Sequence, residues 1–212
     1  KDKPDDLKCA AHINNAAKTL NLLISDLVDL AAIESGKLRV EIGVLNLGAV
    51  ITEVMSRVEV VAERKKIKFT SAALPALPLL QGDPNRIGQV IQNLCTNAIQ
   101  YTKTGGKVTI EVTRQPEWVI VGIRDTGIGI SKEDLPRVWE RFFQSKEAQN
   151  MRKAGFGLGL KISREIVQMH GGDMGIESEL GVGSFFFFKL PVAKALPVAP
   201  VRTPVPAARP RA

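Results

Sequence analysis

The stretch Asn93-Leu-Cys-Thr-Asn97 places two asparagines four residues apart inside a segment, 84–101, whose apolar residues recur with helical spacing. Side chains four residues apart lie one above the other on a helix, so both carboxamides share one face. A carboxamide oxygen is a hard ligand that suits Mg²⁺, and its NH₂ group can donate to a phosphate oxygen. Taken alone, however, the pair is more typical of two solvated amides on a wet helix face.

Two further motifs follow in a fixed order. Asp125-Thr-Gly127-Ile-Gly129 comes after a strand-like run, and Gly155-Phe-Gly157-Leu-Gly159-Leu begins another helix. The Asp carboxylate can accept a hydrogen bond from the exocyclic amine of adenine, which guanine does not offer at that place. Free N–H groups at a helix start favour phosphate oxygens. Each motif alone is a common turn, but the order and spacing of all three, with Arg141-Phe142-Phe143 between the last two, are hard to obtain by chance.

With these motifs the sequence resembles the catalytic ATP-binding domain of sensor histidine kinases, a branch of the superfamily that also contains the gyrase, Hsp90 and MutL ATPases. The resemblance covers roughly residues 12–191. It implies an α+β fold, the Bergerat ATP-binding fold: a two-layer α/β sandwich with a mixed sheet of roughly five strands and about three helices on one face. It also implies ATP and Mg²⁺ as cofactors, a phosphoacceptor His on a helix outside this sequence, and a response-regulator receiver domain as partner.

The resemblance also assigns the nucleotide site. Asn97 is the expected Mg²⁺ ligand, Asn93 a supporting contact to phosphate or water, and Asp125 the adenine contact. The expected nucleotide-binding residues are Asn93, Asn97, Gln100, Tyr101, Asp125, Gly127, Gly129, Ile130, Lys153, Gly155, Gly157, Leu158 and Gly159. The polar, glycine-free stretch 144–154 is interpreted as a mobile lid over the nucleotide. Its candidate phosphate cations are Lys146, Arg152 and Lys153.

Three positions depart from the family pattern. Gln100 stands where many sensor kinases have a Lys, and Gln144 where many have an Arg, a variant that resembles hybrid kinases. Phe156 stands where Thr or Ser is usual. The loss of two cations puts tight phosphate binding in doubt unless lid residues compensate. These departures favour a second hypothesis, a degenerate nucleotide-sensing or dimerisation module without kinase activity.

Position 93 separates phosphate transfer from hydrolysis. Hydrolytic relatives carry a Glu there that activates water, and Asn93 cannot take that proton. A hydrolytic ATPase, the third hypothesis, is therefore disfavoured, and the hinge-like Glu34-Ser-Gly36 also argues against it. The acceptor-His string of the family is absent, and neither His12 nor His170 lies in a matching context. We therefore expect a kinase fragment that does not autophosphorylate alone.

Residues 8–34 are predicted to form one long amphipathic helix that ends at Gly36. Ile13, Leu20 and Leu27 recur every seven residues, and two parallel rows of Ala, Leu and Ile run beside them. Such a seam indicates a bundle or coiled-coil partner, and the segment resembles the end of the second dimerisation helix of a sensor kinase. We expect a homodimer through residues 8–34; the alternative is a helix that packs on its own domain.

Three domains or segments are expected: 1–36, the end of the dimerisation helix pair; 37–191, the catalytic domain; and 192–212, a flexible tail with five prolines and no acidic residue. Within 37–191, alternation and capping residues predict the following elements. Strands are expected at 38–42, 67–72, 107–114, 118–125, 173–178 and 184–190, and helices at 46–65 with Asn46 as cap, at 84–101, from Ser131, and at 157–170.

The composition limits the partners. The tail carries four cations, so residues 1–191 account for only +3 of the net charge of +7. A basic face with interleaved aromatic residues, which nucleic-acid binding would favour, is absent. No apolar run approaches the length of a membrane span, and Cys9 and Cys95 show no metal-ligand spacing. We expect a reduced, cytoplasmic setting, or the equivalent side of an organelle membrane, and no nucleic-acid partner.

Overall fold

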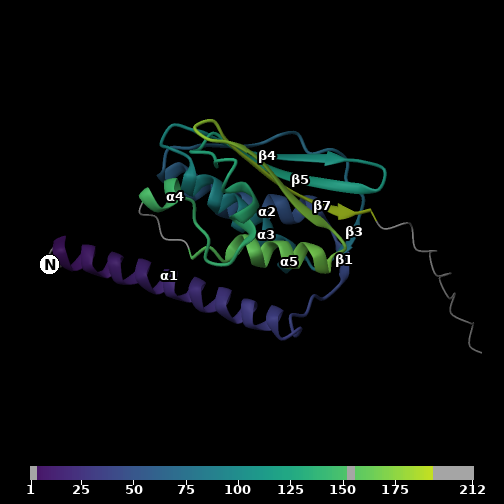
Figure 1. Ribbon diagram of the computed structural model, residues 1–212, viewed down its shortest axis with the longest axis horizontal. Helices are drawn as coiled ribbons and strands as arrows, with labels where there is room; N and C mark the ends of the chain where they lie inside the picture. Colours follow the sequence, from purple (N-terminus) through teal and green to yellow (C-terminus); the bar gives the residue numbers. More distant parts are fainter. Residues whose placement is uncertain (1–3, 152–155, 193–212) are drawn as a thin grey trace, which may run out of the picture.

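The computed structural model describes residues 4–151 and 156–192, and Figure 1 shows a helical layer against one face of a sheet. The helices are α1 (Pro4–Glu34), α2 (Leu47–Arg64), α3 (Pro84–Tyr101), α4 (Lys146–Asn150) and α5 (Gly159–Met169), with a 3₁₀ helix at Leu135–Trp139. The strands are β1 (Gly43–Leu45), β2 (Lys68–Ser71), β3 (Leu80–Gly82), β4 (Lys107–Arg114), β5 (Trp118–Asp125), β6 (Asp173–Glu179) and β7 (Gly183–Pro191).

The main sheet has five strands in the order β2-β4-β5-β7-β6. β2 runs parallel to β4 and the other neighbours are antiparallel, so the sheet is mixed. Successive strand residues point to opposite faces, and one face is apolar. Its buried side chains include Val108, Ile110, Val121 and Phe188. The predicted α+β sandwich with a five-stranded mixed sheet is confirmed.

Helices α2, α3 and α5 cover that apolar face. The Asn46 side chain caps α2 by accepting from the Ala49 N–H at 3.1 Å, as predicted. Asp83 caps α3 by accepting from the N–H groups of Asn85 and Arg86, and Pro84 occupies the first turn. A proline fits there because its missing N–H would have no partner in the helix. The stripe on α3 that includes Ile87, Val90 and Leu94 is fully buried, which turns the opposite flank with its amides away from the core.

The strand predicted at 38–42 is wrong. Residues 37–42 form an irregular link, because the N–H groups of Lys37 and Leu38 both bond to the Ala32 carbonyl and Leu38 turns into the core. The strand is β1, which pairs antiparallel with β3 in a separate two-stranded sheet. β3 was not predicted.

The helix expected from Ser131 is a turn, in which Ser131 Oγ accepts from the Asp134 N–H, followed by the 3₁₀ helix.

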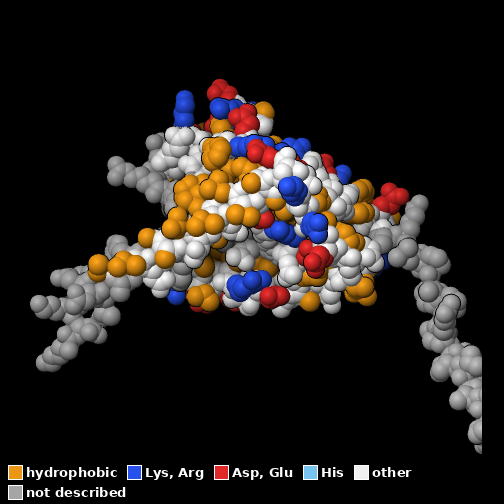
Figure 2. All heavy atoms as spheres, turned by 90° about the horizontal axis from the view of Figure 1, so that it is seen from below, with side chains coloured by type: hydrophobic (Ala, Val, Ile, Leu, Met, Phe, Trp, Pro, Cys, Tyr) orange, Lys and Arg blue, Asp and Glu red, His pale blue; other side chains and the backbone are white. Residues whose placement is uncertain are grey.

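α1 packs on the domain only near its end. Leu30 is buried, and the Asp29 carboxylate accepts hydrogen bonds from Arg86 at 2.9 and 3.0 Å and from Gln89 at 2.8 Å. Glu34 forms an ion pair with Arg141. Farther toward the N-terminus the apolar seam is exposed, and Figure 2 shows hydrophobic side chains along this projecting part. The exposed apolar residues are Ile13, Leu20, Leu22, Ile24, Leu27 and Val28.

The boundaries proposed for the three segments stay predictions. Apart from Val192, the expected tail lies outside the described residues. Val192 continues β7 by donating its N–H to the Glu117 carbonyl at 2.8 Å. None of the helices in the described ranges has the length and hydrophobicity that a membrane crossing requires.

Candidate functional site

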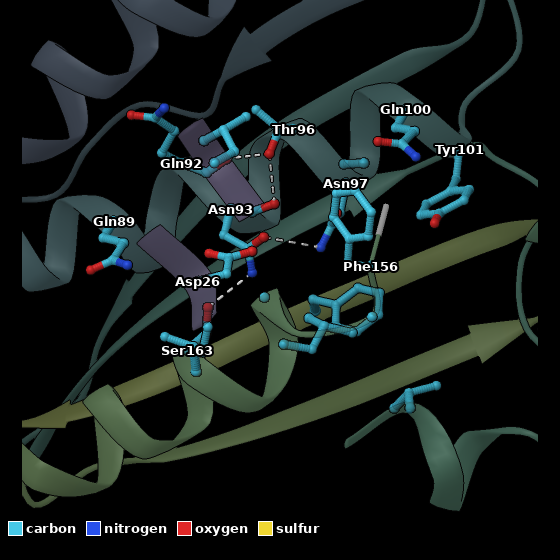
Figure 3. Close-up of a pocket in the computed structure, with 18 of the residues that line it drawn as sticks. Asp26, Gln89, Gln92, Asn93, Thr96, Asn97, Gln100, Tyr101, Phe156 and Ser163 are labelled. Atoms are coloured by element: carbon cyan, nitrogen blue, oxygen red, sulfur yellow. Dashed lines mark hydrogen bonds between the residues drawn. The ribbon is translucent and has the colours of Figure 1, made fainter. Parts of the chain in front are cut away.

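A cavity of about 840 Å³ lies between α3, α5, the loop after β5 and the end of α1 (Figure 3). Most of the predicted nucleotide-binding residues line it: Asn93, Asn97, Gln100, Tyr101, Asp125, Gly129, Ile130, Gly157 and Gly159. Gly127 and Leu158 do not line it, and Lys153 and Gly155 lie outside the described residues. Segments far apart in the sequence therefore meet at one site.

The two asparagines of α3 form a short polar chain. The Asn93 amide donates to Ser163 Oγ at 2.9 Å, and the Asn97 amide points to Asn93 Oδ1 at 3.5 Å. Both side chains are half-buried. The Asn97 nitrogen turns toward Asn93. The Asn97 oxygen therefore points away from Asn93.

The donor set suits Mg²⁺ held mainly by phosphates. In the described ranges, no three His, Cys, Asp or Glu side chains come together to hold a metal ion. Mg²⁺ usually keeps several waters and binds through one or two protein oxygens plus substrate phosphates. A single carboxamide oxygen from Asn97 fits that pattern, so the residues present are compatible with the ion.

Asp125, at the end of β5, is a buried carboxylate. Its Oδ1 accepts from the Gly127 N–H at 2.7 Å, and only 7% of the residue is exposed. Burial raises the pKa of Asp125 to about 6, although backbone hydrogen bonds from Gly127 and Ser184 oppose the rise. A carboxylate in this environment gains from a donor such as the amine of adenine.

The glycines after Asp125 hold this loop against its neighbours. A β-carbon at Gly127 would lie 2.7 Å from the Tyr101 carbonyl oxygen, which also accepts from the Ile128 N–H. Gly129 has a φ of +66°, and a β-carbon there would lie 1.9 Å from the Glu179 carbonyl oxygen. Both positions need glycine for backbone packing. Their close approach seats the loop on the end of α3 and on the β6–β7 turn.

The third motif packs on the aromatic pair and on Asn93. Gly157 has a φ of +66° and accepts from the Phe142 N–H, and a β-carbon there would lie 2.6 Å from the Phe143 carbonyl oxygen. At Gly159 a β-carbon would lie 2.4 Å from Asn93 Oδ1. Leu158 belongs to the core, with 1% exposure.

The stretch predicted as a lid contains α4, which Ser145 caps by accepting from the Ala148 N–H. Gln144 lines the main cavity. Lys146 lines a second, smaller cavity of about 410 Å³ with Arg137 and Arg141. Two further candidate cations, Arg152 and Lys153, lie outside the described residues. Mobility of this stretch stays a prediction.

Sequence reasoning missed the wall that α1 contributes. The cavity is lined on this side by Leu22, Ser25, Asp26 and Asp29. Burial raises the pKa of Asp26, and the nearby charge of Asp29 raises it further by a smaller amount. No local pattern reveals this wall, because it depends on a contact between residues 57 positions apart, Asp29 and Arg86. Ser163 was also missed, although its position four residues after Gly159 places both on one face of α5.

The two-layer sandwich thus holds a cavity between α3, α5 and the loop after β5, lined by residues of all three sequence motifs. Residues 82–194, more than half of the chain, match the family described as "Histidine kinase-, DNA gyrase B-, and HSP90-like ATPase". The chain belongs to this family.

The chain is also similar to named proteins and to solved structures. Sensor histidine kinase RcsC of Escherichia coli K12 is 33% identical over 181 residues, which cover 85% of this chain and 19% of RcsC. The chain thus spans about a fifth of that relative. The fold is similar to full-length ShkA in complex with AMPPNP (TM-score 0.77, 24% identity, 92% of this chain, 40% of ShkA). It also resembles histidine kinase ThkA in complex with response regulator protein TrrA (TM-score 0.67, 27% identity, 90% of this chain, 53% of ThkA).

Proposed function

We propose that this chain is the catalytic domain of a two-component sensor histidine kinase, which binds Mg·ATP and donates the γ-phosphate to a His on a dimerisation helix outside these residues. The observation that carries the proposal is the cavity that brings Asn93, Asn97 and Asp125 together with Gly157 and Gly159. Family membership and the sensor-kinase relatives support it.

Each side chain then has a role in binding. Asp125 accepts from the amine of adenine, the loop around Gly129 fits the base, and N–H groups at the start of α5 face phosphate oxygens. Asn97 would hold Mg²⁺, which neutralises charge on the phosphates when bound. The chain's own contribution to transfer is therefore to position the nucleotide.

Asn93 favours transfer over hydrolysis. Its carboxamide cannot act as a base, and its nitrogen is engaged with Ser163. We infer that the site holds ATP without turning it over efficiently with water as acceptor.

One observation favours the alternative, a nucleotide-sensing or dimerisation module without kinase activity. Gln100 and Gln144 line the cavity where related kinases have cations, and in the part of the chain that the structure describes its lining cations are Arg57 and Arg86. Arg86 is paired with Asp29. The intact Asn97 and Asp125 argue against the alternative.

The partners follow from the same proposal. The exposed seam on α1 supports a homodimer through residues 8–34. The solved ThkA–TrrA complex supports a response-regulator receiver domain as the next phosphate acceptor. We place the domain in the reduced cytosol, where the thiols of Cys9 and Cys95 remain free.

The test supplies the chain in trans with the acceptor helix pair of its parent protein and with γ-³²P-ATP. We expect acid-labile label on the acceptor His, no label on the chain alone, and loss of transfer in Asn97→Ala. Acid-stable label on the chain, or no label on the acceptor while Mg·ADP still binds, would favour the alternative.

A further inference from the structure

Ser163 is a buried serine at the nucleotide cavity that belongs to none of the three motifs. It lies in the second turn of α5, with 2% of the residue exposed, and its Oγ accepts the Asn93 Nδ2–H at 2.9 Å (Figure 3). A buried hydroxyl on an apolar helix face costs free energy unless it is hydrogen-bonded. The structure gives this hydroxyl Asn93 as its partner.

Gly159 explains how Asn93 reaches Ser163. The two α5 residues are four apart and share a helix face. Any side chain at position 159 would collide with the Asn93 carboxamide, because a β-carbon there would lie 2.4 Å from its oxygen and 3.0 Å from its nitrogen. The missing side chain therefore makes a slot on α5 that holds the end of Asn93.

The direction of these contacts orients both amides. Asn93 presents its nitrogen to Ser163 and its oxygen to the Asn97 nitrogen at 3.5 Å. If the Asn93 amide rotated by half a turn, its NH₂ would face the NH₂ of Asn97, and two donors cannot bond to each other. Asn97 would then have to turn its oxygen toward Asn93 and away from the cavity.

We propose that Ser163 is a positioning residue for the metal site: it fixes Asn93, and Asn93 holds the Asn97 carboxamide with its oxygen free for Mg²⁺. This inference rests on the proposed function of the cavity. It assigns Gly159 a second role besides phosphate approach, since the slot at Gly159 is what lets α5 orient a side chain of α3. Partners that orient a metal ligand typically matter by about 10–100-fold in metal affinity.

The experiment measures ADP affinity by calorimetry, once with Mg²⁺ and once with EDTA, for the wild-type chain and Ser163→Ala. We expect Ser163→Ala to reduce the gain that Mg²⁺ gives by roughly tenfold, with less than about a twofold change in EDTA. Ser163→Thr keeps the hydroxyl and should restore the gain. Thr70→Val is the matched control, because it removes a hydroxyl contact to Thr109 that does not line the cavity.

A second readout needs no nucleotide. In the NMR spectrum of the nucleotide-free chain, Ser163→Ala should shift the side-chain NH₂ signals of both Asn93 and Asn97, whereas Thr70→Val should leave them in place. If Ser163→Ala lowers the melting temperature too far, Ser163→Cys, which keeps the volume but bonds weakly, replaces it. An unchanged Mg²⁺ gain in a folded variant overturns the inference and leaves the proposed function intact. A wild-type chain that binds no adenine nucleotide overturns both.

Discussion

The backbone N–H of Asp83 donates to Nε2 of His170 at 2.9 Å, and this contact joins the start of α3 to the end of α5. The other ring nitrogen, Nδ1, lies 2.7 Å from the Ile166 carbonyl oxygen. Because Nε2 accepts, Nδ1 is the ring nitrogen that donates to this carbonyl. With 6% exposure and both nitrogens engaged, His170 is a structural residue, which agrees with the expectation that it is not the phosphoacceptor.

Replacing His170 should therefore destabilise the fold. His170→Phe fills the space but leaves the Asp83 N–H and the Ile166 carbonyl without this partner, at a cost of about 1–3 kcal/mol per buried group. Urea unfolding followed by circular dichroism measures the loss. Met169→Ala, at the neighbouring exposed position, should change the unfolding free energy by less than about 1 kcal/mol. Equal stability of His170→Phe and the wild type would refute the structural role.

Asp125→Asn should raise stability while it weakens nucleotide binding. Burial raises the pKa of Asp125 from 3.8 to about 6. The contribution of this carboxyl group to the free energy of unfolding is therefore fully present below about pH 4 and is lost as the pH rises to about 6. The free energy of unfolding of Asp125→Asn should therefore exceed that of the wild type by an amount that grows to about 3 kcal/mol between pH 4 and pH 6. Above this range the difference should stay constant. Denaturant titrations at several pH values measure the difference.

Nucleotide affinity should show the opposite trend with pH. The ionised carboxylate is the better acceptor for the adenine amine, so ADP affinity in the wild type should rise through about pH 6. Asp125→Asn should lose this rise. A flat wild-type profile between pH 5 and 8 would show that Asp125 does not contact the bound base.

Removing the Asp29 carboxylate should release the end of α1. Asp29→Ala leaves the Arg86 side chain, which is only 27% exposed, without its ion-pair partner. We expect a loss of about 1–3 kcal/mol and faster hydrogen exchange in the second half of α1. Glu140→Ala breaks an ion pair with Arg137 in which both side chains are more than half exposed, and should cost at most about 1 kcal/mol. Unchanged exchange in Asp29→Ala would mean that other contacts hold α1.

The exposed seam should support self-association. Leu20 and Leu27 lie seven residues apart and are 56% and 47% exposed, so their burial between two copies would remove apolar surface from water. Sedimentation should show concentration-dependent association that the double variant Leu20→Glu and Leu27→Glu abolishes. If the chain stays monomeric at all concentrations, the predicted self-association through this seam is wrong.

Much of the fold was predictable because local signals and tertiary packing agree. Asn46 caps α2 and Pro84 lies in the first turn of α3, as the preferences of these residues for helix starts predict. The alternation of Leu38, Val40 and Ile42 misled because the three residues do not share one buried face: Leu38 is buried, whereas Ile42 is 52% exposed. The short strand β3 has no alternation of its own to reveal it, since it spans three residues.

Residues that line the cavity could be predicted from the motifs, but their contacts could not. The motifs located Asn93, Asn97 and Asp125, all of which line one cavity. The wall from α1 depends on the Asp29–Arg86 pair, and the link through Ser163 depends on how α5 packs on α3. Such contacts are set by the relative placement of elements, which spacing within one segment does not encode.

A calorimetric titration of the 212-residue chain with Mg·ADP and with Mg·GDP tests directly whether the cavity is an adenine nucleotide site. We expect one site that prefers ADP at least about tenfold, because one good polar contact contributes about 1–3 kcal/mol. Asp125→Ala should remove the preference, and Asn97→Ala should remove the gain from Mg²⁺. Equal affinity for the two nucleotides, or unchanged binding in both variants, would contradict an adenine nucleotide site in this cavity.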